Sequence, residues 1–172
     1  MATTASPHSM HRFVVIGYGN PQRGDDAIGQ KVVSQLKTLS NPNLDTYSVR
    51  HLTPELSSKL AVADVAIFVD ACKLANTDTV RIKSLEACGS ETGGSAVPAS
   101  GHSCDPCSLL ALTHSAYGHW PKAWWVEVPA SDFTAEHQLS DVAERGITQA
   151  LQAISDLINE ALIDQATPAQ SP

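Results

Sequence analysis

The sequence has no long apolar run, no excess of basic residues and few cysteines. No stretch reaches the roughly 18 apolar residues of a membrane-spanning helix. The net charge of −7 argues against nucleic acid as a partner but leaves open a protein with a basic docking surface. Residues 1–11 are polar, unlike a signal peptide, and four cysteines without an export signal are expected to be reduced. We therefore expect a cytoplasmic protein that binds neither membrane nor nucleic acid.

What the chain does contain is enough apolar sequence for one complete domain. Its 172 residues are 42% hydrophobic and 17% charged, which is typical of an ordinary globular protein. Residues 1–11 and 165–172 predict flexible tails. Residues 12–164 are therefore expected to form a single domain.

Short apolar segments alternate with amphipathic ones along this domain. The expected strands are residues 12–17, 44–49, 64–70, 79–85 and 123–128. The expected helices are residues 26–38, a segment starting at 53–55, residues 105–117 and residues 140–162, with a surface loop at 86–101. This alternation predicts an α/β fold, a three-layer domain whose twisted, mostly parallel sheet carries helices on both faces. Ligands of such sheets bind beyond the carboxyl ends of the strands, where the strand order switches.

The glycine loop after the first strand does not match a nucleotide-binding motif. A dinucleotide fingerprint beginning at Gly17 requires a third glycine where this chain has Gln22. A P-loop fits the spacing from Gly19 to Gly24, but Asp25 and Asp26 replace its lysine and hydroxyl residue. Two carboxylates repel phosphate and attract cations, so we expect no nucleotide cofactor.

Two acids and one histidine follow different strands of the predicted sheet. Asp26 lies after the glycine loop, Asp70 closes the strongest apolar strand, and His102 stands between a Gly- and Ser-rich loop and a helix. Taken singly, Asp70 can be an ordinary turn residue and His102 an exposed one. Together they can form an open, three-ligand site for a borderline divalent ion such as Ni²⁺ or Zn²⁺. For Asp25 we predict a different role, as the N-cap of the first helix.

Several segments carry a family resemblance across residues 12–162. They are Val-Ile-Gly-Tyr-Gly-Asn at 15–20, Asp-Asp-Ala-Ile-Gly at 25–29, Leu-Thr-Pro-Glu-Leu at 52–56, Ile-Phe-Val-Asp-Ala at 67–71, Gly-His at 101–102 with Pro106, Leu109 and Leu110, Tyr-Gly-His-Trp-Pro at 117–121, and Trp-Trp-Val at 124–126. In these segments the chain resembles the nickel–iron hydrogenase maturation endopeptidases, within them the branch that serves bidirectional, NAD-linked hydrogenases.

The resemblance implies an activity, a partner and a site. The activity is removal of the C-terminal extension from the precursor of the hydrogenase large subunit after nickel insertion. Asp26, Asp70 and His102 are then the metal-binding and catalytic residues, and the nickel is carried by the substrate. Either a carboxylate or a metal-bound water can be the base in peptide-bond hydrolysis.

One segment departs from the family pattern. Many relatives have Asp-Gly-Gly-Thr after the second strand, whereas this chain has Arg50, His51, Leu52 and Thr53. The role credited to that acid in some relatives is therefore not transferred, and whether His51 replaces it is left open.

Two other functions remain alternatives. Cys104 and Cys107 form a Cys-x-x-Cys pair at a helix start, which can be a thioredoxin-like dithiol with a lowered Cys104 pKa, or part of a small zinc site with His114 and His119. A nickel-dependent chaperone that binds the same precursor without cutting it is the second alternative.

Overall fold

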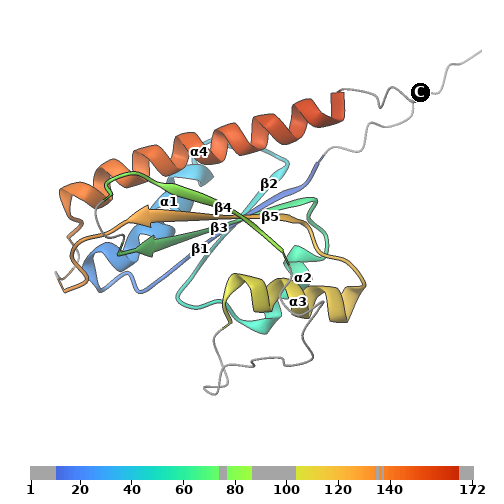
Figure 1. The fold of residues 1–172 in the computed structure, drawn as a ribbon, viewed down its shortest axis with the longest axis horizontal. Coiled ribbons are helices and arrows are strands. Elements are labelled where there is room, and N and C mark those ends of the chain that lie inside the picture. The colour runs from blue at the N-terminus through green and yellow to red at the C-terminus, as the bar shows by residue number, and fades with distance from the viewer. Residues whose placement is uncertain (1–10, 74–76, 87–103, 135, 137, 167–172) are drawn as a thin grey trace, which may run out of the picture.

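The computed structural model describes residues 11–73, 77–86, 104–134, 136 and 138–166. These residues form one twisted sheet between two layers of helices (Figure 1). His102 and Cys88 lie outside the described residues. Within the described part, no helix is long and apolar enough to cross a membrane.

The sheet has five strands in the order β2-β1-β3-β5-β4. The strands are β1 (Phe13–Tyr18), β2 (Leu44–Val49), β3 (Val65–Cys72), β4 (Arg81–Leu85) and β5 (Lys122–Pro129). β1 pairs in parallel with β2 and β3, and β3 pairs in parallel with β5. Edge strand β4 runs antiparallel to β5. The prediction of a mostly parallel α/β sheet is confirmed.

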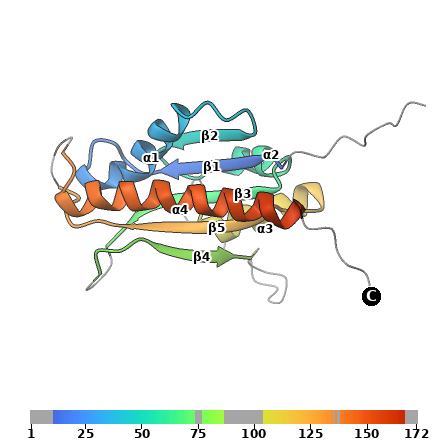
Figure 2. The same cartoon turned by 90° about the horizontal axis from the view of Figure 1, so that it is seen from above.

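The helices cover both faces of the sheet, as predicted. They are the 3-10 helices η1 (Gly24–Ala27) and η2 (Pro54–Leu56) and the α-helices α1 (Ile28–Lys37), α2 (Ser57–Leu60), α3 (Pro106–Tyr117) and α4 (Asp141–Ala166). α1 and α4 pack on one face, whereas α2 and α3 pack on the other (Figures 1 and 2). α4 extends two residues into the predicted C-terminal tail.

Alternating side chains of the central strands supply the two cores. Val15, Ile67 and Val126 point towards α1 and α4, whereas Ile16 and Phe68 point towards α2 and α3. β1 and β3 are apolar on both faces because both faces are covered, in contrast to the more exposed edge strands β2 and β4. Burial of these two runs therefore fixes β1 and β3 at the centre of the sheet.

The strand order switches between β1 and β3. The chain leaves β1 through α1 to reach β2 on one side, then crosses back past β1 through α2 to reach β3 on the other. The register pairs Gly17 with Val69, so both strands end at the same edge of the sheet. Ligands bind at such a switch point in open α/β sheets.

A close contact between two glycines brings the first helix to this edge. A Cβ on Gly17 would collide with the carbonyl group of Gly29, and a Cβ on Gly29 would lie 2.6 Å from the carbonyl oxygen of Val69. α1 can approach the ends of β1 and β3 only because both positions lack a side chain. The predicted helix at 26–38 accordingly begins as η1, which carries Asp26, and becomes α-helical at Ile28.

Candidate functional site

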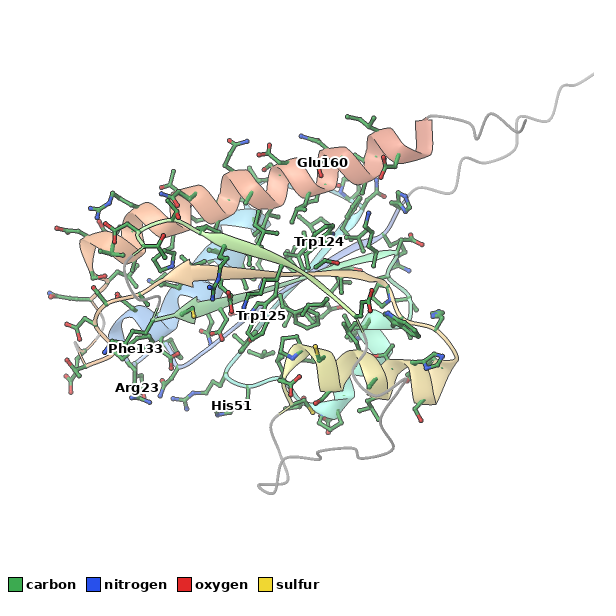
Figure 3. The ribbon with its side chains drawn as sticks, viewed as in Figure 1. Arg23, His51, Trp124, Trp125, Phe133 and Glu160 are labelled. Atoms are coloured by element: carbon green, nitrogen blue, oxygen red, sulfur yellow. The ribbon has the colours of Figure 1, made fainter. Side chains whose placement is uncertain are left out.

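The candidate site lies at the carboxyl edge of the sheet, where β1 and β3 end. η1 supplies Asp26 and β3 supplies Asp70, so both predicted acids lie on elements that border the switch point. In Figure 3, Arg23 lies at the same end of the sheet, to which the arrowheads of β3 and β5 point. His51 lies on the loop after β2, on the side of α2 and α3.

The loop after β1 holds the Asp26 carboxylate. Its Oδ2 atom accepts a hydrogen bond of 3.0 Å from the backbone N–H of Asn20. The backbone N–H of Asp26 itself donates to the carbonyl oxygen of Arg23 at 3.0 Å. Asp26 remains half-buried, so its second carboxylate oxygen can bind a proton, a cation or a substrate group.

Asp70 is a carboxyl group whose surroundings oppose its ionisation. Burial raises its pKa to about 6, the negative charges of Asp26 and Glu127 add to the rise, and hydrogen bonds from the Tyr18 side chain and the Ala71 N–H oppose it. Asp26 therefore lies near enough to Asp70 for its charge to raise the Asp70 pKa. A carboxyl pKa near 6 is suited to accepting a proton at neutral pH.

Tyr18 was not predicted as a site residue. Burial, together with the charge of Asp70 and the hydrogen bond to it, raises the pKa of the Tyr18 hydroxyl, so that group stays protonated and donates to Asp70. The buried indole Nε1 of Trp125 partly offsets this rise, although it makes no well-aligned hydrogen bond. A polar aromatic side chain at the last position of an apolar strand was the available signal.

Glu127 was also missed. It is buried on β5 directly beside Asp70, and its carboxylate is bound by Arg81 Nε at 2.7 Å and Lys83 Nζ at 3.0 Å. Burial raises the Glu127 pKa, but these two cations lower the pKa by more than burial raises it, so the net effect is a decrease. Glu127 therefore stays ionised and acts on the site through its charge.

The prediction that Asp25 caps the first helix is wrong. Asp25 lies within η1, is fully buried, and accepts hydrogen bonds at Oδ2 from the backbone N–H groups of Ser131 (2.7 Å) and Asp132 (2.9 Å). The N–H of Ser140 donates to Oδ1 and its hydroxyl to Oδ2, both at 2.7 Å. Asp25 thus ties the loop that carries Asp26 to the connection between β5 and α4.

The predicted three-ligand metal site is only partly described. The charge of Asp26 acts on Asp70, whereas His102 lies outside the described residues, so the three-residue site stays a prediction. Among the residues that the structure does describe, no three His, Cys, Asp or Glu side chains form a metal-binding group. His51, considered as a replacement for the family's acid, is exposed on the loop after β2.

The thiol chemistry of the dithiol alternative is not supported. Asp105 rather than a cysteine caps α3, accepting a hydrogen bond from the Ser108 N–H. Burial raises the pKa of the Cys104 thiol, and the charges of Asp105 and Glu55 raise it further. The prediction of a lowered Cys104 pKa is wrong, because neighbouring carboxylates oppose the thiolate.

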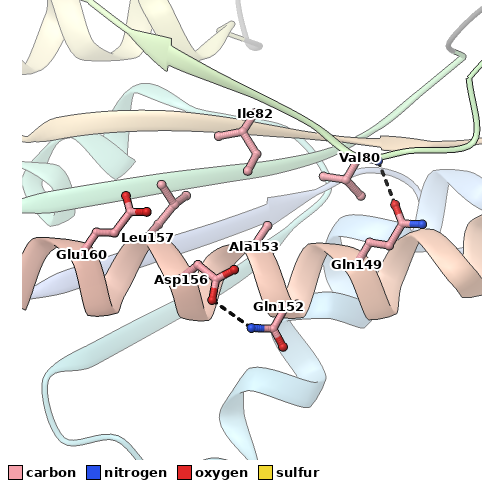
Figure 4. Close-up of a pocket in the computed structure, with 8 residues that line it drawn as sticks. All are labelled: Val80, Ile82, Gln149, Gln152, Ala153, Asp156, Leu157 and Glu160. Atoms are coloured by element: carbon pink, nitrogen blue, oxygen red, sulfur yellow. Dashed lines mark hydrogen bonds between the residues drawn. The ribbon is translucent and has the colours of Figure 1, made fainter.

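A cavity of about 440 Å³ lies away from the carboxylate pair, between β4 and α4 (Figure 4). Its described lining consists of aliphatic, amide and carboxylate side chains, namely Val80, Ile82, Gln149, Gln152, Ala153, Asp156, Leu157 and Glu160. Gln149 is engaged with the backbone of Val80, and Gln152 with Asp156. This lining offers no imidazole or thiol, so we place the chemistry at the switch point.

Comparison with known proteins identifies the fold. No protein-family profile and no curated protein sequence matches the chain. The hydrogenase maturating endopeptidase HybD from E. coli has a TM-score of 0.67 and 22% identity, over 87% of this chain and 93% of its own. For the nickel–iron hydrogenase maturation protease HycI from Thermococcus kodakarensis the TM-score is 0.64 and the identity 21%, over 88% and 94%. A hydrogenase 2 maturation peptidase from a Thaumarchaeota archaeon gives 0.64 and 22%, over 86% and 98%. The chain has the fold of these hydrogenase maturation proteases.

Asp70 is expected to titrate near pH 6 in the metal-free protein, followed by the ¹³C chemical shift of its carboxyl carbon. Asp26→Asn should lower this pKa because it removes a neighbouring negative charge, whereas Asp78→Asn, an exposed control, should leave it unchanged. Folding favours protonated Asp70, so its contribution to stability is complete below about pH 4 and lost as pH rises through about 6. A midpoint near pH 4, or one insensitive to Asp26→Asn, would contradict the coupled pair.

Asp25→Asn is expected to lower the free energy of unfolding at pH 7 by about 2–4 kcal/mol, because an amide NH₂ must face backbone donors in place of a charged acceptor. Burial raises the Asp25 pKa, but the hydrogen bonds from Ser140, Asp132 and Ser131 outweigh it and lower the pKa overall. The stabilisation is therefore complete above about pH 4 and lost as pH falls through the folded-state pKa.

Urea unfolding at pH 7 and pH 3 measures this difference between wild type and Asp25→Asn. The difference should shrink at pH 3, and Asp78→Asn should stay within about 0.5 kcal/mol of wild type at both pH values. A cost for Asp25→Asn no larger than that of Asp78→Asn would show that the buried carboxylate does not hold the loop.

Proposed function

We propose that the chain is an endopeptidase that removes the C-terminal extension of the nickel-loaded large-subunit precursor of a nickel–iron hydrogenase. What supports this proposal is that the charge of Asp26 raises the pKa of Asp70, on β3 beside the switch point of the sheet. The fold shared with hydrogenase maturation proteases supports it.

The carboxylate pair suits a substrate that brings its own cation. Two like charges held close together in a partly buried site repel each other, and a divalent ion relieves that repulsion. Nickel accepts carboxylate oxygen and imidazole nitrogen as ligands. We propose that Asp26, Asp70 and His102 contact the nickel of the precursor, so that only a loaded precursor binds productively.

Asp70 is our proposed general base. A water molecule attacks the scissile carbonyl carbon, its proton passes to the Asp70 carboxylate, and the peptide C–N bond then breaks. The proton returns to the departing amine, which leaves a free carboxylate on the mature subunit and a free amine on the extension. The Tyr18 hydroxyl orients Asp70 for this exchange through its hydrogen bond.

Two narrower predictions belong to the same proposal. The family resemblance of the sequence favours a precursor from a bidirectional, NAD-linked hydrogenase, and maturation of that precursor is expected in the cytoplasm. The alternative function, a nickel-dependent chaperone that does not cut, involves the same carboxylates and differs only in its product.

Asp26→Asn, Asp70→Asn and His102→Ala are each expected to reduce cleavage of the nickel-loaded precursor at least 100-fold. Asp26→Asn and Asp70→Asn each remove a proposed metal-contacting or proton-accepting carboxylate while keeping the size of the side chain, and His102→Ala removes the proposed imidazole ligand. The measurement is the rate at which the shortened subunit appears on incubation with purified protein. Because the three residues act as a unit, the double variants should be no slower than the slowest single variant.

Asp78→Asn is the matched control, because its exposed carboxylate forms only a 3.7 Å contact with Arg145 and should keep wild-type activity. Circular dichroism must show that each inactive variant is folded. Cleavage at the wild-type rate by folded Asp26→Asn or Asp70→Asn would contradict the proposed site.

A further inference from the structure

The end of β2 is held against the loop that carries Asp26. The side-chain amide of Gln30 donates to the carbonyl oxygens of Gly19 at 2.8 Å and Val49 at 3.0 Å. The N–H of Gly19 also donates to the carbonyl oxygen of Val49 at 3.2 Å. Arg50 follows Val49 directly, so these contacts fix its backbone beside the candidate site.

A single residue, Asn20, connects the Arg50 side chain to the Asp26 carboxylate. Its Nη2 atom donates to the side-chain oxygen of Asn20 at 2.8 Å, and the backbone N–H of Asn20 donates to Asp26 at 3.0 Å. The Asn20 side-chain oxygen also accepts from the Gln22 N–H, at 3.0 Å, and is thereby fixed in place. Asn20 thus connects the Arg50 guanidinium to the loop that holds the Asp26 carboxylate.

The ion pairing of the five arginines divides them into two groups. Arg12, Arg81 and Arg145 each pair with a carboxylate. Arg23 and Arg50 are exposed and make no ion pair within the described part of the chain, although 18 acidic residues outnumber the 11 lysines and arginines. Both belong to segments that border Asp26, so the arginines left available are the ones at the site.

We propose that Arg50, assisted by Arg23, binds a carboxylate of the precursor polypeptide and so sets which peptide bond reaches Asp70. This inference rests on the proposed function. A guanidinium offers parallel N–H donors that match a carboxylate, and among the described residues Arg50 makes one side-chain hydrogen bond, to Asn20. It also offsets the repulsion that Asp26 and Asp70 exert on an acidic peptide. The carboxylate is either an acidic side chain of the extension or its C-terminal group.

Arg50→Gln tests the charge separately from the fold, because glutamine can still donate a hydrogen bond to Asn20. We expect KM for the nickel-loaded precursor to rise about tenfold in Arg50→Gln, with kcat nearly unchanged. The KM of Arg50→Lys should lie between those of wild type and Arg50→Gln. Arg145→Gln, an equally cationic residue on α4, is the control and should keep the wild-type KM. A merely structural role for Arg50 would instead lower kcat or stability in Arg50→Gln. A wild-type KM in Arg50→Gln would overturn the inference.

Two altered precursors identify the source of the carboxylate. In one, the acidic side chains of the extension become amides; in the other, a few glycines displace the terminal carboxylate. On the precursor that lacks the recognised group, wild type and Arg50→Gln should have the same raised KM. A KM difference between the two proteins that persists unchanged on both altered precursors would contradict recognition of a substrate carboxylate.

Binding of a synthetic peptide that copies the extension separates this inference from the proposed function. If wild type fails to cleave, weaker binding by Arg50→Gln than by wild type and Arg145→Gln still supports the carboxylate site. Equal binding by all three proteins, or no binding by any, overturns it.

Discussion

The carboxylate of Asp25 is a buried charge on which the geometry of the site depends. A carboxylate in this position is tolerated only when hydrogen-bond donors replace its water shell. Here three backbone N–H groups and one hydroxyl do so, all from residues 131–140. Because Asp25 precedes Asp26, the same bonds fix the loop that presents Asp26 to β3. Asp25 therefore has a structural role, whereas the next residue, Asp26, is available for chemistry.

The second constraint is the arrangement of β1 and β3. Both strands are buried on both faces and run to one edge of the sheet, where β3 carries Asp70 and the segment after β1 carries Asp26. Asp26 and Asp70 are both acidic, and the charge of Asp26 disfavours the ionisation of Asp70. The hydrogen bond from Tyr18 lowers the pKa of Asp70, whereas the charge of Glu127 raises it. A cation would relieve the unfavourable charge at this site, which is consistent with the proposed substrate that arrives with nickel.

Sequence reasoning predicted much of the fold, whereas the site formed by Asp26, Asp70 and His102 stays a prediction. The apolar runs of β1 and β3 predict central parallel strands, and parallel strands place their carboxyl ends together. The partners of Asp25 could not be predicted, because they lie 106 to 115 residues further along the chain. The antiparallel direction of β4 could not be predicted from the sequence either, since side-chain alternation is the same in parallel and antiparallel strands. In the sequence, nothing distinguishes Glu127 from any other acid in a strand. Only the register between β3 and β5 places it beside Asp70.

The central claim is that the carboxylate pair cuts a precursor only after that precursor has received nickel. The most direct measurement is the intact mass of nickel-loaded and nickel-free large-subunit precursor after incubation with the purified wild-type chain. The account predicts that the loaded precursor loses the mass of its C-terminal extension and that the nickel-free precursor keeps its full mass. A loaded precursor that binds the chain but retains its full mass would contradict the account and identify a chaperone instead. Equal cleavage of both precursors would show that the carboxylates do not recognise the metal.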